Sequence, residues 1–171
     1  MWFIVIIILV LIVLIYKTEE YPVDNTLGQN AKQITSIQFN NYPIMNNQHL
    51  SKKILATPPV VQFNGKEGKY HTFMMIDIDD PTPNNGSELR HWLVINVPSG
   101  AMIDNSSQTL SPYLSPDPIV GKHRYHLRLY EQSQLLNIGI DPDRYNWDSE
   151  GFAKQMELTL VGQVQILCGV N

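Results

Sequence analysis

The feature that most constrains this chain is an unbroken apolar run at its N-terminus. All 16 residues from Met1 to Tyr16 are apolar or aromatic, and Lys17 follows directly. Every charged side chain of the 171-residue chain lies beyond this run, although apolar residues make up 43% of the whole. The sequence therefore joins two different parts, an apolar N-terminal segment and a more polar part that we call the body. The body, residues 33–171, is long enough for one domain with a sizeable core.

We expect residues 1–16 to form one N-terminal transmembrane, or signal-anchor, helix. A helix of this length rises about 24 Å, slightly less than a bilayer core of about 30 Å. Snorkelling by Lys17 and local thinning of the bilayer close this gap. Trp2 and Tyr16 stand where interfacial aromatic residues belong. Residues 17–32 are polar and aperiodic and contain a proline and a glycine, which is typical of a linker.

Two other interpretations of the run remain open, a cleaved signal peptide and a buried soluble helix. A signal peptide needs a basic region before its apolar segment and small residues at its cleavage site. No basic residue precedes Trp2, and Tyr16 is followed by bulky and charged residues. The β-branched side chains on all sides of the run suit lipid better than the core of a soluble protein.

The charges beside the run predict how the protein would lie in a membrane. Lys17 and Lys32 both follow the run, so the positive-inside rule favours a single-pass membrane protein with a cytosolic body. Two acceptor triplets for N-glycosylation, at Asn85 and Asn105, suggest the opposite orientation, because they are used only in a lumenal body. Such triplets are frequent by chance in an Asn-rich chain, so the cytosolic orientation is our expectation.

Composition excludes several classes of function. The net charge is −4, from 12 basic and 16 acidic residues, so the chain has no basic footprint for nucleic acid. Its apolar content is too high for a disordered chain. Its one cysteine, Cys168, excludes an intrachain disulfide scaffold and a zinc site built from cysteines. Because Cys168 lies in an apolar segment, we expect a small buried side chain.

Short apolar segments separated by turn residues predict a mostly β body. The sequence predicts strands over residues 34–39, 60–63, 70–78, 91–97, 125–130 and 158–168. Two of them, 70–78 and 91–97, are apolar on both faces, as in central strands that are covered on two sides. Asp148 is expected to cap one short helix over 151–157. With 11 prolines and 10 glycines, the pattern favours an all-β sandwich or barrel, and residues 105–120 predict a long functional loop.

Three acidic residues gather where the strand at 70–78 ends. Asp77, Asp79 and Asp80 precede Pro81 in a turn. Carboxylates at this spacing can bind a divalent cation, or they can accept hydrogen bonds from loop amides and hold the turn. The residues alone favour the second interpretation.

Two further segments bring histidines into apolar strands. His91 lies beside Arg90, and a histidine near a guanidinium can help hold an anion. His123 and Tyr125 are two residues apart, so in a strand they share one face. A nucleophile elbow, a phosphate-binding glycine loop and a zinc-protease motif are all lacking from the sequence. We therefore expect no catalytic residue, no metal site and no cofactor.

In this order, the segments resemble the phosphatidylethanolamine-binding protein family, which is also known through Raf kinase inhibitor proteins and plant flowering regulators. The family's Asp-Pro-Asp-Ala-Pro and Trp-His-His-Phe-Leu-Val-x-Asn elements correspond to residues 77–81 and 89–96. Its Gly-x-His-Arg-Tyr element, leading to Tyr-Glu-Gln, corresponds to residues 121–125 and 130–132. Looser similarity extends from about residue 34 to residue 168, which is nearly all of the body and none of the apolar run.

The resemblance implies an antiparallel β-sandwich with a short C-terminal helix and a small anion pocket at one end. In this family the pocket receives phosphate-like groups, including phospholipid headgroups. Carried over residue by residue, the pocket would be lined by Asp77, Pro81, His91, Ser115, Pro116, His123 and Tyr125. Imidazole N–H and tyrosine hydroxyl groups can donate to phosphate oxygens, and Asp77 can orient a histidine through its other ring nitrogen.

This chain departs from the family pattern near that pocket. Ile78 replaces a proline, and Leu89 and Arg90 replace the first two residues of the Trp-His-His element. Asp80 and Asp117 add two carboxylates, each expected to weaken anion binding by about 1 kcal/mol through Coulomb repulsion. Arg90 or Lys122 is the candidate to offset them.

The prediction from sequence is a membrane-tethered, non-catalytic protein that binds a phospholipid headgroup or another phosphate-like anion, such as a phosphorylated small ligand. The alternative is a protein-interaction module that inhibits or scaffolds a kinase or a protease, as relatives do. A hydrolase or metal enzyme that uses the acidic cluster is the least favoured interpretation.

Overall fold

The computed structural model describes residues 33–81, 88–104, 106–141 and 143–169. The predicted transmembrane helix, residues 1–16, and the predicted linker, residues 17–32, lie outside the described residues. Among the residues that are described, no helix is both long enough and apolar enough to span a bilayer.

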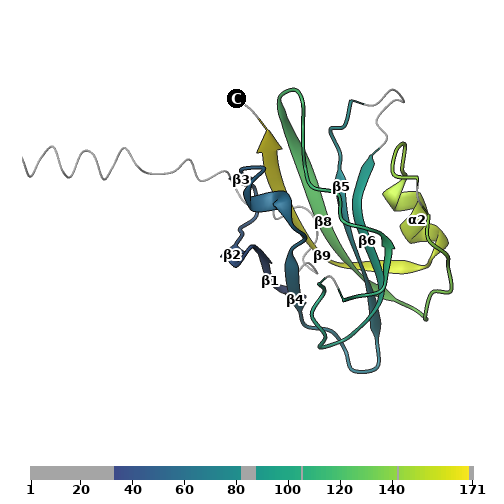
Figure 1. Cartoon of the computed structure of the whole chain (residues 1–171). Helices are drawn as coiled ribbons and strands as arrows, with labels where there is room; N and C mark the ends of the chain where they lie inside the picture. Colours follow the sequence, from purple (N-terminus) through teal and green to yellow (C-terminus); the bar gives the residue numbers. More distant parts are fainter. Residues whose placement is uncertain (1–32, 82–87, 105, 142, 170–171) are drawn as a thin grey trace, which may run out of the picture.

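Two β-sheets and one short helix form the described part of the body. In chain order the elements are β1 (Ile34–Phe39), β2 (Tyr42–Pro43), β3 (Gln48–Leu50), the 3-10 helix η1 (Ile54–Ala56), β4 (Val60–Phe63), β5 (Tyr70–Asp77), β6 (Leu89–Pro98), β7 (Thr109–Ser111), β8 (Lys122–Gln132), α2 (Ser149–Gln155) and β9 (Leu158–Gly169). The small sheet has the order β2-β1-β4, and the large sheet has the order β3-β9-β8-β5-β6-β7. Figure 1 shows the long strands side by side, with the small sheet on one side and α2 on the other.

The large sheet is buried on both faces, as the apolar pattern of its central strands predicts. Alternate residues of β5 separate into two cores, with Phe73 and Met75 in one and Met74 in the other. The first core lies between the two sheets and contains Phe39 and Val61 of the small sheet. The second lies under α2 and the segment before it. Covering both faces explains why β5 is buried from its second residue to its last.

The expectation of a mostly β fold with one short helix near the C-terminus is confirmed, but an antiparallel arrangement throughout is wrong in one place. β3 pairs with β9 in parallel. The turn before β3 adjoins this pairing: Asn47 has a positive φ of 62°, and its backbone N–H donates to the carbonyl of Gln165 at 2.7 Å. β2, β3 and β7 were not predicted, because strands of two or three residues are too short to show an alternating pattern.

Asp148 caps α2, as predicted, although the helix begins at Ser149 and not at Gly151. The Asp148 carboxylate accepts a hydrogen bond from the Gly151 backbone N–H at 2.8 Å. The cap holds α2 where Ala153 and Phe152 pack on the second core.

We expect Asp148→Ala to lower the free energy of unfolding by about 1 kcal/mol, because the first turn of α2 loses its side-chain acceptor. Asp148→Asn is the matched control, since asparagine caps helices about as well as aspartate. Urea denaturation of the two variants beside the unsubstituted chain measures the difference. Equal losses in the two variants would show that the charge of Asp148, and not its capping bond, stabilises the fold.

Candidate functional site

A β-bulge in β6 decides where His91 points. Two consecutive residues of β5 pair with Trp92 and Arg90 of β6, so His91 is the extra residue on the β6 side. A bulge breaks the alternation of faces and redirects a side chain. Trp92 packs in the core between the sheets. His91 lies on that same side, because its ring meets the ring of Tyr125 edge-on, with centroids 5.2 Å apart.

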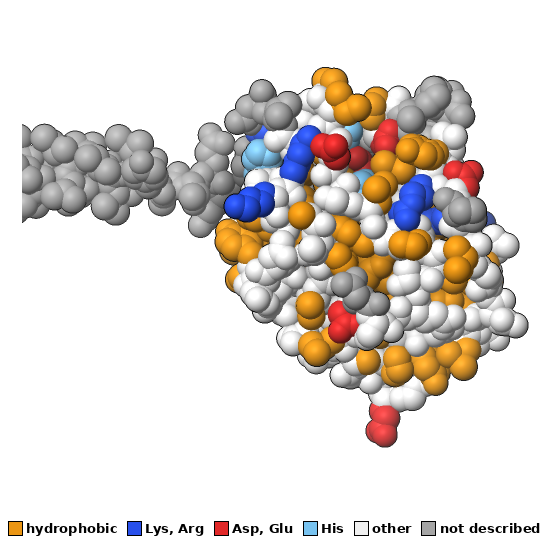
Figure 2. Space-filling model, in the orientation of Figure 1, with side chains coloured by type: hydrophobic (Ala, Val, Ile, Leu, Met, Phe, Trp, Pro, Cys, Tyr) orange, Lys and Arg blue, Asp and Glu red, His pale blue; other side chains and the backbone are white. Residues whose placement is uncertain are grey.

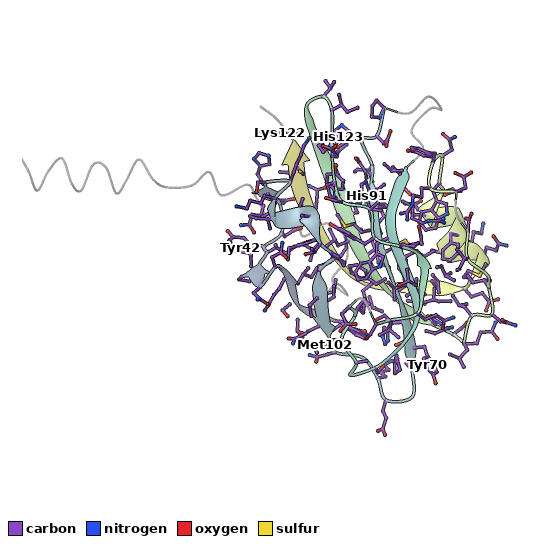
Figure 3. All side chains as sticks on the ribbon, in the orientation of Figure 1. Tyr42, Tyr70, His91, Met102, Lys122 and His123 are labelled. Carbon is purple, nitrogen blue, oxygen red and sulfur yellow. The ribbon has the colours of Figure 1, made fainter. Side chains whose placement is uncertain are left out.

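Three further side chains reach the same end of this face from neighbouring strands. Asp77 ends β5 and lies opposite Tyr125 of β8. His123 precedes Tyr125 by two residues and shares its face, as the sequence predicts, and their rings stack with centroids 6.5 Å apart. All four side chains are buried. We call Asp77, His91, His123 and Tyr125 the His–Tyr cluster, and Figure 3 labels its two histidines.

His91 is held by one nitrogen and leaves the other without a partner. Its Nδ1 donates to the carbonyl of Leu114 at 2.7 Å, and the Leu114 backbone N–H donates to the His91 carbonyl at 2.7 Å. Its Nε2 is buried and meets no hydrogen-bond partner in the described part of the chain. Burial lowers the pKa of His91, although the Leu114 carbonyl and the Asp77 carboxylate oppose this effect. The ring is therefore neutral near pH 7, with Nε2 unprotonated.

His123 differs because both of its ring nitrogens face oxygen atoms. Nδ1 lies 2.7 Å from Oδ2 of Asp77, and Nε2 lies 3.2 Å from the carbonyl of Val120. The other carboxylate oxygen of Asp77 accepts the backbone N–H of Asp79 at 2.9 Å. Asp77 thus orients His123 as proposed from the sequence. Both ring nitrogens of His123 are therefore engaged within the protein.

Tyr125 supplies a hydroxyl that stays protonated. Burial raises its pKa, and the neighbouring carboxylate of Asp77 raises it further. A phenol that does not ionise remains a hydrogen-bond donor at any physiological pH. Around this donor the cluster combines one carboxylate and two imidazoles.

The remaining predicted site residues lie around the cluster and not within its hydrogen bonds. Pro81 is exposed just beyond the end of β5, and Pro116 is buried in the segment between β7 and β8. The hydroxyl of Ser115 donates to the carbonyl of Leu55 at 3.0 Å, which ties this segment to η1. The role of these residues in ligand contact stays a prediction.

Two carboxylates near the cluster, Asp79 and Asp117, are paired with cations. Arg124 donates two hydrogen bonds from its guanidinium to Asp79, at 2.6 and 2.8 Å. Asp117 forms an ion pair with Lys52 at the surface. No group of three potential metal ligands occurs among the described residues. The turn-holding interpretation of Asp77 and Asp79 therefore agrees with the geometry.

The expectation that Arg90 offsets the added carboxylates is wrong. Arg90 is 1% exposed and points to the opposite face of the large sheet. There it donates to the Asp141 carboxylate at 3.1 Å and to the Asp141 carbonyl at 2.7 Å, and it lies 4.7 Å from the ring of Trp147. Neighbouring residues of a strand point to opposite faces, and the bulge decides that His91 faces the core between the sheets while Arg90 faces the other side. Lys52, a residue distant in sequence, is the cation that pairs with Asp117.

Two contributions to the site were missed because they come from the backbone. The carbonyl of Leu114 fixes the ring of His91, and the carbonyl of Val120 faces His123. A carbonyl is present in every residue, so no side-chain pattern marks these two. The only signal available was the length of the Pro-rich segment that carries both.

Comparison with known proteins agrees with this geometry. The family model described as "Phosphatidylethanolamine-binding protein" matches residues 35–165. The chain belongs to this family. One relative, "Protein MOTHER of FT and TFL1 homolog 2" from Oryza sativa subsp. japonica, is 36% identical over 108 residues, which are 60% of this chain and 62% of the relative. The chain spans less than two thirds of the length of the first curated relatives that it matches.

Two solved structures share the fold. A carboxypeptidase Y inhibitor, in complex with its cognate proteinase, matches with a TM-score of 0.66 and 18% identity over 80% of this chain and 82% of its own. The phosphatidylethanolamine-binding protein from Plasmodium vivax matches with a TM-score of 0.65 and 18% identity over 80% of this chain and 84% of its own. At this identity the likeness extends to the fold alone. It supports the mostly β arrangement predicted from the family resemblance.

We expect Arg124→Gln to reduce stability in a pH-dependent way. The hydrogen bonds from Arg124 hold the pKa of Asp79 below its usual range. Their contribution is therefore complete above the unfolded pKa, about 3.9, and is lost as the pH falls through the lower folded pKa. Because Arg124 is 51% exposed, we expect a loss of only about 0.5–1 kcal/mol at pH 7.

Urea denaturation between pH 2 and pH 7 at constant ionic strength measures this effect. The difference between Arg124→Gln and the unsubstituted chain should shrink toward zero at the acidic end. Lys69→Gln is the control, because it removes a cation from a looser ion pair with Glu131, at 3.8 Å. A difference for Arg124→Gln that stays constant over the whole pH range would contradict the assignment.

Proposed function

We propose that this protein is a membrane-tethered, non-catalytic binding protein whose His–Tyr cluster holds a phospholipid headgroup or another phosphate-like anion. The observation that carries the proposal is the Nε2 atom of His91, which is buried beside Tyr125 and has no partner among the described residues. A buried polar atom without a partner is costly. A bound ligand with polar oxygens would remove this cost.

The geometry suggests how an anion would be bound. The Leu114 carbonyl occupies Nδ1 of His91, so a proton added to the ring goes to Nε2 and creates a donor on the ring that meets Tyr125 edge-on. Within the cluster, the charge of Asp77 is engaged by His123 and by the amide of Asp79. A phosphate oxygen would then meet a cationic imidazolium that donates, next to the neutral phenol of Tyr125, whose hydroxyl also interacts with Asp77.

Membrane tethering rests on the apolar run of residues 1–16, with the body placed on the cytosolic side by Lys17 and Lys32. The linker of 16 residues, 17–32, would keep the body close to the bilayer. Such a tether raises the effective concentration of the binding site toward lipid without any new contact. The family supports a binding role, and no nucleophile in the cluster is paired with a base.

The test follows from the protonation of His91. Because burial lowers the pKa of the free ring and an anion needs the protonated ring, binding should take up a proton. We expect the affinity to rise by up to about tenfold for each pH unit below pH 8, and to level off below the pKa of free His91. Calorimetry of the full chain in neutral-detergent micelles measures this with glycerophosphoethanolamine, a phosphodiester whose charge does not change over this range.

Two variants keep the test specific. His91→Phe retains a ring but removes both nitrogens, so binding should weaken and lose its pH dependence. His71→Phe is the matched control, because His71 is equally buried but packs on Phe63 at the other end of β5. A pH-independent affinity in the unsubstituted chain, or equal effects of the two variants, would contradict the proposal.

A second candidate function is inhibition of a protease. The observation in its favour is the structural likeness to a carboxypeptidase Y inhibitor that was solved with its cognate proteinase. This role would use a protein surface and not the His–Tyr cluster. We therefore expect any protease that co-purifies with the full chain to bind His91→Phe as tightly as the unsubstituted chain. Loss of the protease in His91→Phe would place its contact at the cluster instead.

A further inference from the structure

Two adjacent apolar side chains are exposed at the rim of the His–Tyr cluster. Ile119 is 92% exposed and Val120 is 75% exposed, in the bend that leads into β8. Figure 2 shows hydrophobic side chains at this end of the molecule, next to charged side chains and histidines. Single exposed apolar residues are common, but a pair of this exposure beside a ligand site is characteristic of a contact surface.

The structure holds this pair in place relative to the cluster. The carbonyl of Val120 faces Nε2 of His123 at 3.2 Å. Earlier in the same segment, Leu114 exchanges two hydrogen bonds with His91, and Tyr113 donates to the carbonyl of Leu55 at 2.7 Å. We call Ile119 and Val120 the tip. Their exposed side chains therefore belong to a segment whose two ends are hydrogen-bonded to the binding residues.

The charge beside the tip fits a lipid surface. Lys122, two residues after Val120, is exposed, and the described residues form no ion pair with it. Lys52 and Arg124 lie at the same end and are already paired with Asp117 and Asp79. An apolar pair flanked by a basic residue is the arrangement by which segments enter the interface of a bilayer that contains anionic lipid.

The length of the predicted linker, residues 17–32, does not by itself fix which face of the body meets the bilayer. Sixteen extended residues reach up to about 53 Å, whereas a body of this length has a radius of gyration of about 14 Å. A tether of this reach lets every face of the body turn toward the bilayer. The face that does so must be chosen by contacts of the body itself.

We propose that Ile119 and Val120 enter the interfacial layer of an anionic bilayer, so that the His–Tyr cluster faces the membrane and takes its headgroup from a lipid in place. This inference rests on the membrane-proximal binding role proposed above and adds the surface that makes the contact. The apolar side chains lose exposed area on insertion, and Lys122 remains among the anionic headgroups. The segment that fixes the rings of His91 and His123 then lies against the lipid headgroups, which supply the ligand.

The test uses a fluorescent label that reports lipid contact. Ile119→Cys in the full chain is labelled with a nitrobenzoxadiazole probe and reconstituted in phosphatidylcholine–phosphatidylserine vesicles with or without doxyl-labelled acyl chains. The unsubstituted chain, whose single cysteine is buried, is the blank. Leu135→Cys is the matched control, because Leu135 is an exposed apolar residue (56% exposed) beyond the far end of β8, roughly 33 Å along the strand from Lys122.

We expect the label at position 119 to shift its emission to the blue and to lose most of it in the doxyl vesicles, while the label at 135 keeps its emission. Emission at 119 that is unaffected by doxyl lipid overturns the inference, whether the tip is then free in solution or occupied by a protein. Equal quenching at both positions also overturns it, because the body would then have no preferred face.

A second variant separates this inference from the proposed function. Ile119→Ser should keep the affinity for soluble glycerophosphoethanolamine, because the side chain of Ile119 is 92% exposed and serine adds no charge near the cluster. In vesicles, Ile119→Ser should lower the lipid affinity by about tenfold, measured from the shifts of the His91 and His123 ring resonances that lipid headgroups cause. Unchanged lipid affinity would overturn the membrane contact and leave the anion site intact. If the unsubstituted chain does not bind soluble glycerophosphoethanolamine, the proposed function is overturned instead.

Discussion

The site depends on the β-bulge between β5 and β6. Without the extra residue, His91 would face the same side as Leu93, which belongs to the core under α2. The bulge instead brings its ring against Tyr125, within the core between the two sheets. Arg90 lies on the opposite face and anchors the segment before α2 through Asp141. The bulge therefore decides which of these two neighbours joins the candidate site and which helps to hold the fold.

The polar groups of the cluster differ in how many of their hydrogen bonds the protein itself provides. Asp77 and His123 bond to each other and to backbone groups, so they form a rigid frame. His91 is fixed at Nδ1 alone, and its Nε2 meets no described partner. A frame with one unsatisfied atom is preorganised for a ligand, because the atoms that bind are already oriented. Burial lowers the pKa of this histidine, so the proposed anion would bind together with a proton.

Strand positions and the short helix were predictable, whereas the directions of two side chains were not. Period-two alternation placed His123 and Tyr125 on one face, and residues 60–63, 70–78 and 158–168 correspond closely to β4, β5 and β9. The same rule fails between His91 and Trp92, because a bulge leaves no mark in the alternation of apolar residues. Alternation alone separates Arg90 from His91, but it does not say which of the two faces the pocket. The parallel pairing of β3 and the carbonyl of Leu114 depend on contacts between distant segments, which local patterns do not encode. The family resemblance supplied the site residues that spacing could not.

The central claim is that Nε2 of His91 is the atom that receives the ligand. Nitrogen-15 chemical shifts of the histidine rings, recorded at pH 7 with and without saturating glycerophosphoethanolamine, test it directly. The account predicts that Nε2 of His91 is unprotonated in the free protein and becomes protonated and hydrogen-bonded on binding, while Nδ1 stays protonated. Saturation with the ligand while Nε2 of His91 remains unprotonated would contradict the account and place the ligand elsewhere.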